Sequence, residues 1–168
     1  MTQANGAAAA AAIRRYLGAQ ELEFEEPDDG VFFFGLPGTT KLSTPVRLQV
    51  GHHHLSVQAF VCRNPDEGHE RVYRWLLERN LRGYGTAYAV DRLGDIYLTG
   101  RLPLSVVTED ELDRLLGALL TNADESFNTL LELGFESSIR AEWKWRRDRG
   151  ESTANLEAFR GWLEAGED

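Results

Sequence analysis

Three consecutive histidines, at residues 52–54, are the side chains in this sequence best suited to metal chemistry. In an extended chain His52 and His54 point to one face and His53 to the other, so the outer two can bind a metal ion from one strand. A complete site needs further convergent ligands, such as Asp66, Glu67 or His69. The simpler interpretation is a hairpin turn whose imidazoles contact water. We therefore expect no metal or other cofactor, and keep a site at His52 and His54 as the alternative.

The single cysteine, Cys62, is the second group that could do chemistry. A thiol nucleophile needs a partner that lowers its pKa, commonly a histidine, and a third group that orients this partner. His69 is close in sequence, but a helix start predicted at Asn64 and Pro65 separates it from Cys62. The glycines between residues 30 and 38 lack the Gly-Lys-Ser/Thr sequence of a phosphate-binding loop. No catalytic residue is predicted, so the chain is not expected to be an enzyme.

The C-terminal part contains a basic cluster with interleaved tryptophans: Arg140, Trp143, Lys144, Trp145, Arg146, Arg147 and Arg149. Aromatic rings among arginines can stack on nucleobases. However, glutamates four residues before Arg140 and Arg146 predict ion pairs on a helix surface. The whole chain has a net charge of −9, which repels phosphate backbones and anionic membranes. Neither nucleic acid nor a membrane is therefore an expected partner.

Size and composition predict a single globular unit. The chain has 168 residues, of which 42% are hydrophobic and 27% charged, and a domain of this length folds without a disulfide or a structural metal. The alanine run at residues 7–12 is too short to cross a bilayer, and its arginines follow it rather than precede it as in a secretory signal. The acidic composition and the lone thiol predict a cytoplasmic location.

Hydrophobic periodicity predicts helices at the two ends of the chain and strands between them. We expect a helix over residues 7–18, a strand near 22–24, and an apolar strand over 31–36 with both faces covered. Two hairpins follow, one turning at residues 51–53 and one at 92–94, with a helix from Asn64 between them. A capping box at Thr108 and Glu111 begins a leucine-rich helix that reaches residue 131. Shorter helices are expected over 138–149 and 154–165. This order predicts an α+β fold with an antiparallel sheet of about five to six strands packed with helices.

Apolar surface is the strongest functional signal in the sequence. A sheet covered by helices on one side leaves its other face to water, to a second copy or to a partner protein, and aromatic residues commonly carry interface energy. Trp143 and Trp145 cannot share one helical face, so one of them is expected to pack inward. The partner-binding candidates are Phe32, Phe34, Tyr84, Tyr88, Tyr97 and Trp143. The simpler interpretation is that they are core residues, and we expect about half of them to be so.

Five short segments in this order resemble the YbjN family of bacterial sensory transduction regulators, whose fold is similar to that of class I type III secretion chaperones. They are LLERN at residues 76–80, TAYAVD at 86–91, GDIYL at 94–98, LPL at 102–104 and TEDEL at 108–112. The resemblance covers residues 13–133 and implies a small acidic protein that binds other proteins, often as a homodimer. It supplies no catalytic residue.

These observations predict two parts and one function. Residues 1–135 are expected to form a YbjN-like α+β domain, and residues 136–168 a C-terminal helical extension packed on or beside it. The expected function is a non-enzymatic protein-interaction module, chaperone- or adaptor-like and regulatory, that binds a client protein through an aromatic sheet and helix surface. The alternative is a metal- or small-ligand-responsive sensor that uses the turn at His52 to His54.

Overall fold

The computed structural model describes residues 2–165, and their side chains from Asn5 onward. Along the chain the elements are α1 (Thr2–Ala19), β1 (Phe24–Asp28), β2 (Val31–Pro37), β3 (Ser43–Val50), β4 (His54–Cys62), α2 (His69–Asn80), β5 (Ala87–Val90), β6 (Ile96–Pro103), η1 (Leu104–Val106), α3 (Glu109–Arg149), η2 (Ala154–Phe159) and α4 (Arg160–Glu164). Both predicted hairpins are present. The predicted cap of the long helix is also confirmed, because the Thr108 hydroxyl accepts a hydrogen bond from the backbone N–H of Glu111 at 3.2 Å.

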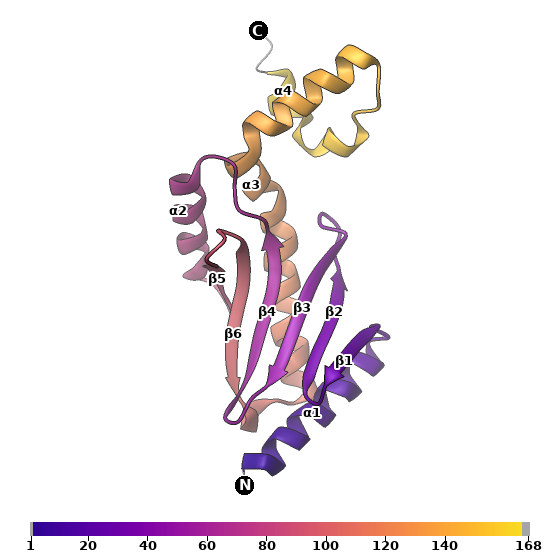
Figure 1. Cartoon of the computed structure of the whole chain (residues 1–168), viewed down its shortest axis with the longest axis vertical. Helices are drawn as coiled ribbons and strands as arrows, with labels where there is room; N and C mark the ends of the chain where they lie inside the picture. The colour runs from indigo at the N-terminus through magenta and orange to yellow at the C-terminus, as the bar shows by residue number, and fades with distance from the viewer. Residues whose placement is uncertain (1, 166–168) are drawn as a thin grey trace.

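The strands form one antiparallel sheet in the order β1-β2-β3-β4-β6-β5 (Figure 1). Strand β4 is central, so Ala59 lies opposite Val46 of β3 on one side and opposite Leu98 of β6 on the other. All three of these side chains are buried. The prediction of an α+β fold with an antiparallel sheet of five to six strands is confirmed.

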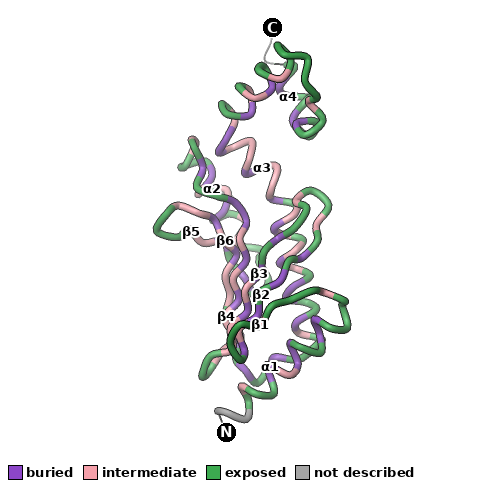
Figure 2. Tube along the Cα trace, turned by 45° about the vertical axis from the view of Figure 1, so that its right-hand side comes forward, coloured by how far each residue is buried: buried purple, intermediate pink, exposed green. Residues whose placement is uncertain are grey.

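Helices α1 and α3 both lie against the same face of the sheet (Figures 1 and 2). Ile13 and Leu17 of α1 and Leu115 of α3 are fully buried there, in one hydrophobic cluster with the inward-facing strand residues. The period of two along β2 places Phe32 in this core and Phe33 on the opposite face, where it is 41% exposed. The prediction that residues 31–36 have both faces covered is therefore wrong, since α1 and α3 cover only one.

Helix α2 begins four residues later than the sequence predicts. Its N-cap is Gly68 rather than Asn64, and residues 64–67 instead form a loop against α3. Gly68 has a φ of 64°, and a Cβ at this position would lie 2.3 Å from the carbonyl oxygen of Leu133. The close approach of the loop to α3 therefore outweighs the local capping signal of Asn64 and Pro65, and it requires glycine at residue 68.

The same loop bends α3. The two helical segments that periodicity predicts are parts of one helix with a kink at Phe135, where φ is −141°. The carbonyl oxygen of Gly134 accepts the backbone N–H groups of Asp66 at 2.9 Å and Glu67 at 3.1 Å. The Glu67 carboxylate in turn accepts the backbone N–H of Ser137 at 2.6 Å. The loop thus replaces the helical hydrogen bonds that are lost at the kink and caps the second segment of α3.

Beyond the kink, the chain forms a helical extension that projects past the end of the sheet (Figure 1). Its buried residues join the same hydrophobic cluster as the body of the protein: Ile139, Trp143, Leu156, Phe159 and Leu163. Of the two neighbouring tryptophans, Trp143 packs inward and Trp145 is 43% exposed. The helix predicted over 154–165 is a 3-10 turn, η2, followed by the short helix α4.

Candidate protein-binding surfaces

The side of the sheet opposite α1 and α3 carries a row of aromatic side chains. A shallow groove of about 260 Å³ on this side is lined by Phe33 of β2, Phe60 of β4 and Tyr97 of β6. We call these three residues the open sheet face. The Phe60 and Tyr97 rings meet edge to face with their centroids 5.5 Å apart. Arg47 lies over the Phe33 ring at 5.8 Å. Figure 2 shows α1 and α3 on the other side of the sheet, so neither helix covers Phe33 or Tyr97. Phe60, near the end of β4, also borders a pocket with Phe127 of α3. The row offers apolar surface beside the polar side chains of Arg47 and Gln58.

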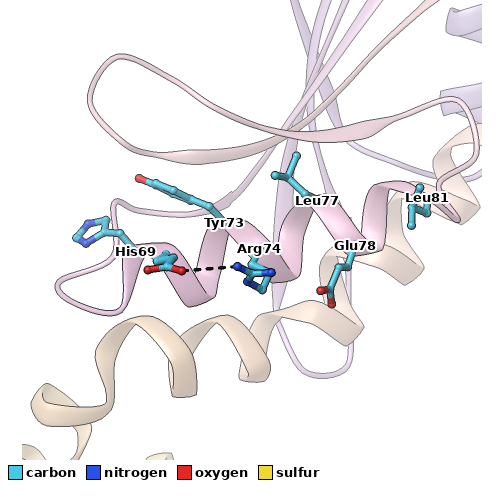
Figure 3. Close-up of a pocket in the computed structure, with 7 residues that line it drawn as sticks. His69, Tyr73, Arg74, Leu77, Glu78 and Leu81 are labelled. Carbon is cyan, nitrogen blue, oxygen red and sulfur yellow. Dashed lines mark ion pairs between the residues drawn. The ribbon is translucent and has the colours of Figure 1, made fainter.

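Helix α2 carries a second apolar surface (Figure 3). Its apolar residues recur every four positions and so follow one side of the helix, at Tyr73, Leu77 and Leu81. We call these three residues the α2 stripe. Leu77 is 68% exposed and Leu81 87% exposed, beside a surface hollow of about 770 Å³. Arg74 forms an ion pair with Glu70 at 3.6 Å along the edge of the stripe.

The structure separates the aromatic residues that the sequence proposes for partner binding into two groups. Phe32, Phe34, Tyr88 and Trp143 are buried, which assigns them to core packing. The Tyr88 hydroxyl, for example, donates to the carbonyl oxygen of Asn122 at 2.9 Å.

Tyr84 and Tyr97 keep accessible surface, so they alone among these aromatics are available to a partner. The Tyr84 hydroxyl donates to Glu111 at 2.8 Å, and this hydrogen bond raises the pKa of Tyr84. The residues that sequence reasoning missed are Phe33, Phe60, Leu77 and Leu81. The alternation along β2 and the four-residue spacing along α2 carried the signal for three of them.

The three histidines lie at the β3–β4 turn, with His52 and His53 exposed and His54 partly buried at the start of β4. The proposed further ligands lie elsewhere: His69 is at the start of α2, where its ring contacts Asn64 at 3.3 Å. Among the residues that the structure describes, no group of three or more His, Cys, Asp or Glu side chains could hold a metal ion. A metal-responsive turn would require a third ligand beside His52 and His54, and the described part of the fold places none there.

Cys62 is buried at the end of β4, and burial raises the pKa of its thiol to about 11. The thiol is accordingly protonated at neutral pH, and it packs as a small apolar group.

The basic cluster of the C-terminal extension is largely engaged within the chain. Arg140 pairs with Glu136 at 3.1 Å and Arg146 with Glu142 at 2.6 Å, as the four-residue spacing predicts. Arg149 lies over the ring of Trp145 at 4.6 Å. These contacts occupy the cations and rings that stacking on nucleobases would need. In the part of the chain that the structure describes, no helix combines the length and apolar character needed to cross a bilayer.

The fold is that of the type III secretion chaperones. A chain of the ExsC–ExsE complex superposes with a TM-score of 0.55 at 17% identity, over 73% of this chain and 92% of that one. A chain of the HopA1–SchA chaperone–effector complex gives 0.51 at 14% identity, over 67% and 88% of the two chains. A chain of the complex of the Yersinia pestis type III secretion chaperone SycH with a stable fragment of YscM2 gives a TM-score of 0.50 at 17% identity, over 68% and 96% of the two chains.

Within this class of fold the chain belongs to the YbjN family, described as "Putative bacterial sensory transduction regulator", whose profile matches residues 9–132. "Uncharacterized protein Rv0487" of Mycobacterium tuberculosis is 58% identical over 124 residues, which are 74% of this chain and 68% of that protein. "Uncharacterized protein ML2442" of Mycobacterium leprae is 52% identical over 139 residues, which are 82% and 76% of the two chains. The resemblance detected in the short segments is thus confirmed.

Proposed function

We propose that this chain is a non-enzymatic protein-interaction module, chaperone- or adaptor-like, that binds an extended apolar segment of a client protein on its open sheet face. The observation that carries the proposal is the row of Phe33, Phe60 and Tyr97 along one groove of the sheet. This groove lies on the side of the sheet opposite α1 and α3 (Figure 2). Aromatic side chains provide large contact area at low conformational cost and dominate many interfaces.

The comparisons support the same kind of function. The structural neighbours are chains of complexes with partner proteins, one of them the HopA1–SchA chaperone–effector complex. The net charge of −9 favours a client with basic stretches beside its apolar residues.

The lone protonated thiol suits a reducing cytoplasm, where we place the protein. We further divide it into the family domain, residues 1–135, and the extension, residues 136–168.

The α2 stripe is the surface we assign to a homodimer. In an antiparallel pairing of two α2 helices, Leu77 of each copy lies near the middle of the contact. Tyr73 of one copy then faces Leu81 of the other, so the apolar groups of the two stripes complement each other. We expect Leu77→Arg to convert a dimer to a monomer in light scattering coupled to size exclusion. Leu93→Arg, a change at a turn residue that is 75% exposed, is the matched control.

Site-specific photo-crosslinking tests client binding. A benzoylphenylalanine replaces Phe33, Tyr97 or, as the control, the exposed Leu93, and the cells that express the variants are irradiated. We expect the same one or few adducts from positions 33 and 97 and none from position 93. A Phe33→Asp change should then abolish the adduct formed at position 97, while the melting temperature changes little because Phe33 is partly exposed. Equal adducts from all three positions, or none from a folded protein, would contradict the proposal.

A further inference from the structure

A pocket of about 550 Å³ lies where β4 ends against α3 and η2. Its volume is in the range of small-molecule binding sites, roughly 300–1,000 Å³. The lining is mainly apolar, with side chains from three elements: Phe60, Phe127, Leu131, Phe135, Ile139 and Leu156.

One wall of this pocket comes from outside the region that matches the family. The family profile ends at residue 132, whereas Phe135, Ile139 and Leu156 follow it. The kink at Phe135 turns the second segment of α3, and Leu156 of η2 adds to the same wall. The C-terminal extension therefore completes a pocket that the family domain alone would leave open.

A lysine ammonium projects into this apolar pocket. Lys41 belongs to the β2–β3 loop, and its Nζ donates to the carbonyl oxygens of Phe60 at 2.6 Å and Val61 at 2.9 Å. It also lies 5.1 Å from the centroid of the Phe60 ring and 5.8 Å from that of Phe127. Two of the three N–H groups are thus engaged by neutral acceptors, and the third has no acceptor in the described part of the chain. Burial lowers the pKa of Lys41 to about 8.

The other charged residues of the pocket lining are already paired. Arg63 forms two hydrogen bonds with Asp66, at 2.7 and 2.9 Å, and lies over the ring of Phe135 at 4.3 Å. Glu142 accepts from Arg146 at 2.6 Å. Three charged residues line the pocket, and within residues 5–165 Lys41 is the one of the three that forms no ion pair.

We propose that this pocket binds a small amphipathic carboxylate, a molecule with one carboxylate and an aliphatic body. The carboxylate accepts the third N–H of Lys41 and supplies the missing opposite charge, while the aliphatic body lies among the aromatic and aliphatic side chains. The single unpaired cation favours a single negative charge on the ligand. Each additional buried methylene raises the affinity about fourfold. This inference goes beyond the proposed function and does not depend on it.

Decanoate is a suitable probe, with decanol and decylammonium as uncharged and oppositely charged counterparts of the same chain length. In calorimetric titrations of the full chain at pH 7, below the concentration at which decanoate forms micelles, we expect one decanoate per chain. Decanol should bind at least about tenfold more weakly because it lacks the charge. Octanoate should bind about fifteenfold more weakly than decanoate, since it buries two fewer methylenes.

The chain contains two lysines, Lys41 and Lys144, which provide a matched pair of variants. We expect Lys41→Met to weaken decanoate binding at least about tenfold, Lys41→Arg to retain most of it, and Lys144→Met to leave it unchanged. Absence of saturable binding, or affinity that is equal for decanoate and decanol, would overturn the proposal. So would unchanged binding in a folded Lys41→Met variant. If Lys41→Met does not fold, the comparison of the three probes with the unmodified chain decides the question.

Discussion

The carboxylate of Asp124 in α3 accepts the backbone N–H of Lys41 at 2.8 Å, which ties the tip of the β2–β3 hairpin to the long helix. The same carboxylate accepts the Thr39 hydroxyl at 2.6 Å and the Thr40 backbone N–H at 2.8 Å. A Cβ at Gly38 would lie 2.4 Å from Asp124 Oδ1, so the approach requires glycine there. Helix α3 therefore positions the loop from which the Lys41 side chain reaches the pocket.

Asp124→Asn should destabilise the protein by about 1 kcal/mol, because a partly exposed carboxylate that accepts three hydrogen bonds is replaced by a neutral amide. The hydrogen bond from Thr39, with those from the backbone, lowers the pKa of Asp124 to about 2, below its ordinary value of 3.8. The folded state therefore gains stability above pH 4 that is lost as the pH falls toward 2. Urea unfolding between pH 6 and pH 2.5 measures this dependence.

The difference in unfolding free energy between wild type and Asp124→Asn should accordingly shrink as the pH falls. Asp148→Asn, at an exposed position near the end of α3, should stay within about 0.5 kcal/mol of wild type. A difference that is constant from pH 6 to 2.5 would show that the Asp124 carboxylate does not stabilise the hairpin through its charge.

Phe32→Ala and Phe33→Ala should differ strongly in stability although the residues are neighbours. Phe32 is fully buried beneath α1 and α3, and truncation of a core phenylalanine costs about 3–5 kcal/mol. Phe33 lies on the open sheet face, and its truncation should cost about 1 kcal/mol or less. Chemical denaturation of both variants provides the measurement. Similar losses in both would mean that the open sheet face is covered in the isolated protein.

Glu67→Ala should loosen the second segment of α3 without unfolding the sheet. The Glu67 carboxylate accepts both the backbone N–H and the hydroxyl of Ser137, at 2.6 and 3.0 Å, as an N-cap would. Loss of such a cap costs about 1 kcal/mol. We expect faster hydrogen exchange of the amides at 137–140, whereas Glu70→Ala, which removes an exposed ion pair, should leave them unchanged. Equal protection in both variants would contradict this assignment.

Asn80→Ala should expose the edge of the sheet. The Asn80 side chain accepts the backbone N–H of Tyr88 at 2.7 Å and donates to its carbonyl oxygen at 3.2 Å, so it occupies the place of a neighbouring strand. Unpaired edge groups cost about 1–3 kcal/mol and invite pairing with other chains. We expect lower stability and larger species in concentration-dependent light scattering. Asn122→Ala is the control, because Asn122 accepts the hydrogen bond from the Tyr88 hydroxyl through its backbone carbonyl, which the change retains. An equal increase in size for this variant would refute the role of Asn80.

Local patterns predicted the elements and most of their order. The alternation of residues 46–50 and 55–61 specified a hairpin, and the leucine spacing after Thr108 specified the long helix, because both periods follow from backbone geometry. The predicted start of α2 was wrong because it depends on contacts with a distant segment of the chain and not on a local pattern. Asn64 and Pro65 form a good local cap, but the hydrogen bonds between the 64–67 loop and Gly134 bring in a segment about 70 residues away.

The sequence by itself determined the class of fold and the family, since these depend on periodicity and on short segments in a fixed order. It could not determine which aromatic residues face a partner, because Phe32 and Phe33 have the same chemistry and differ only in which face of β2 they occupy. Nor could it place Lys41 against Phe127 and Leu156, residues far apart along the chain. Only the packing of the hairpin, α3 and the extension decided that an apolar pocket surrounds this ammonium.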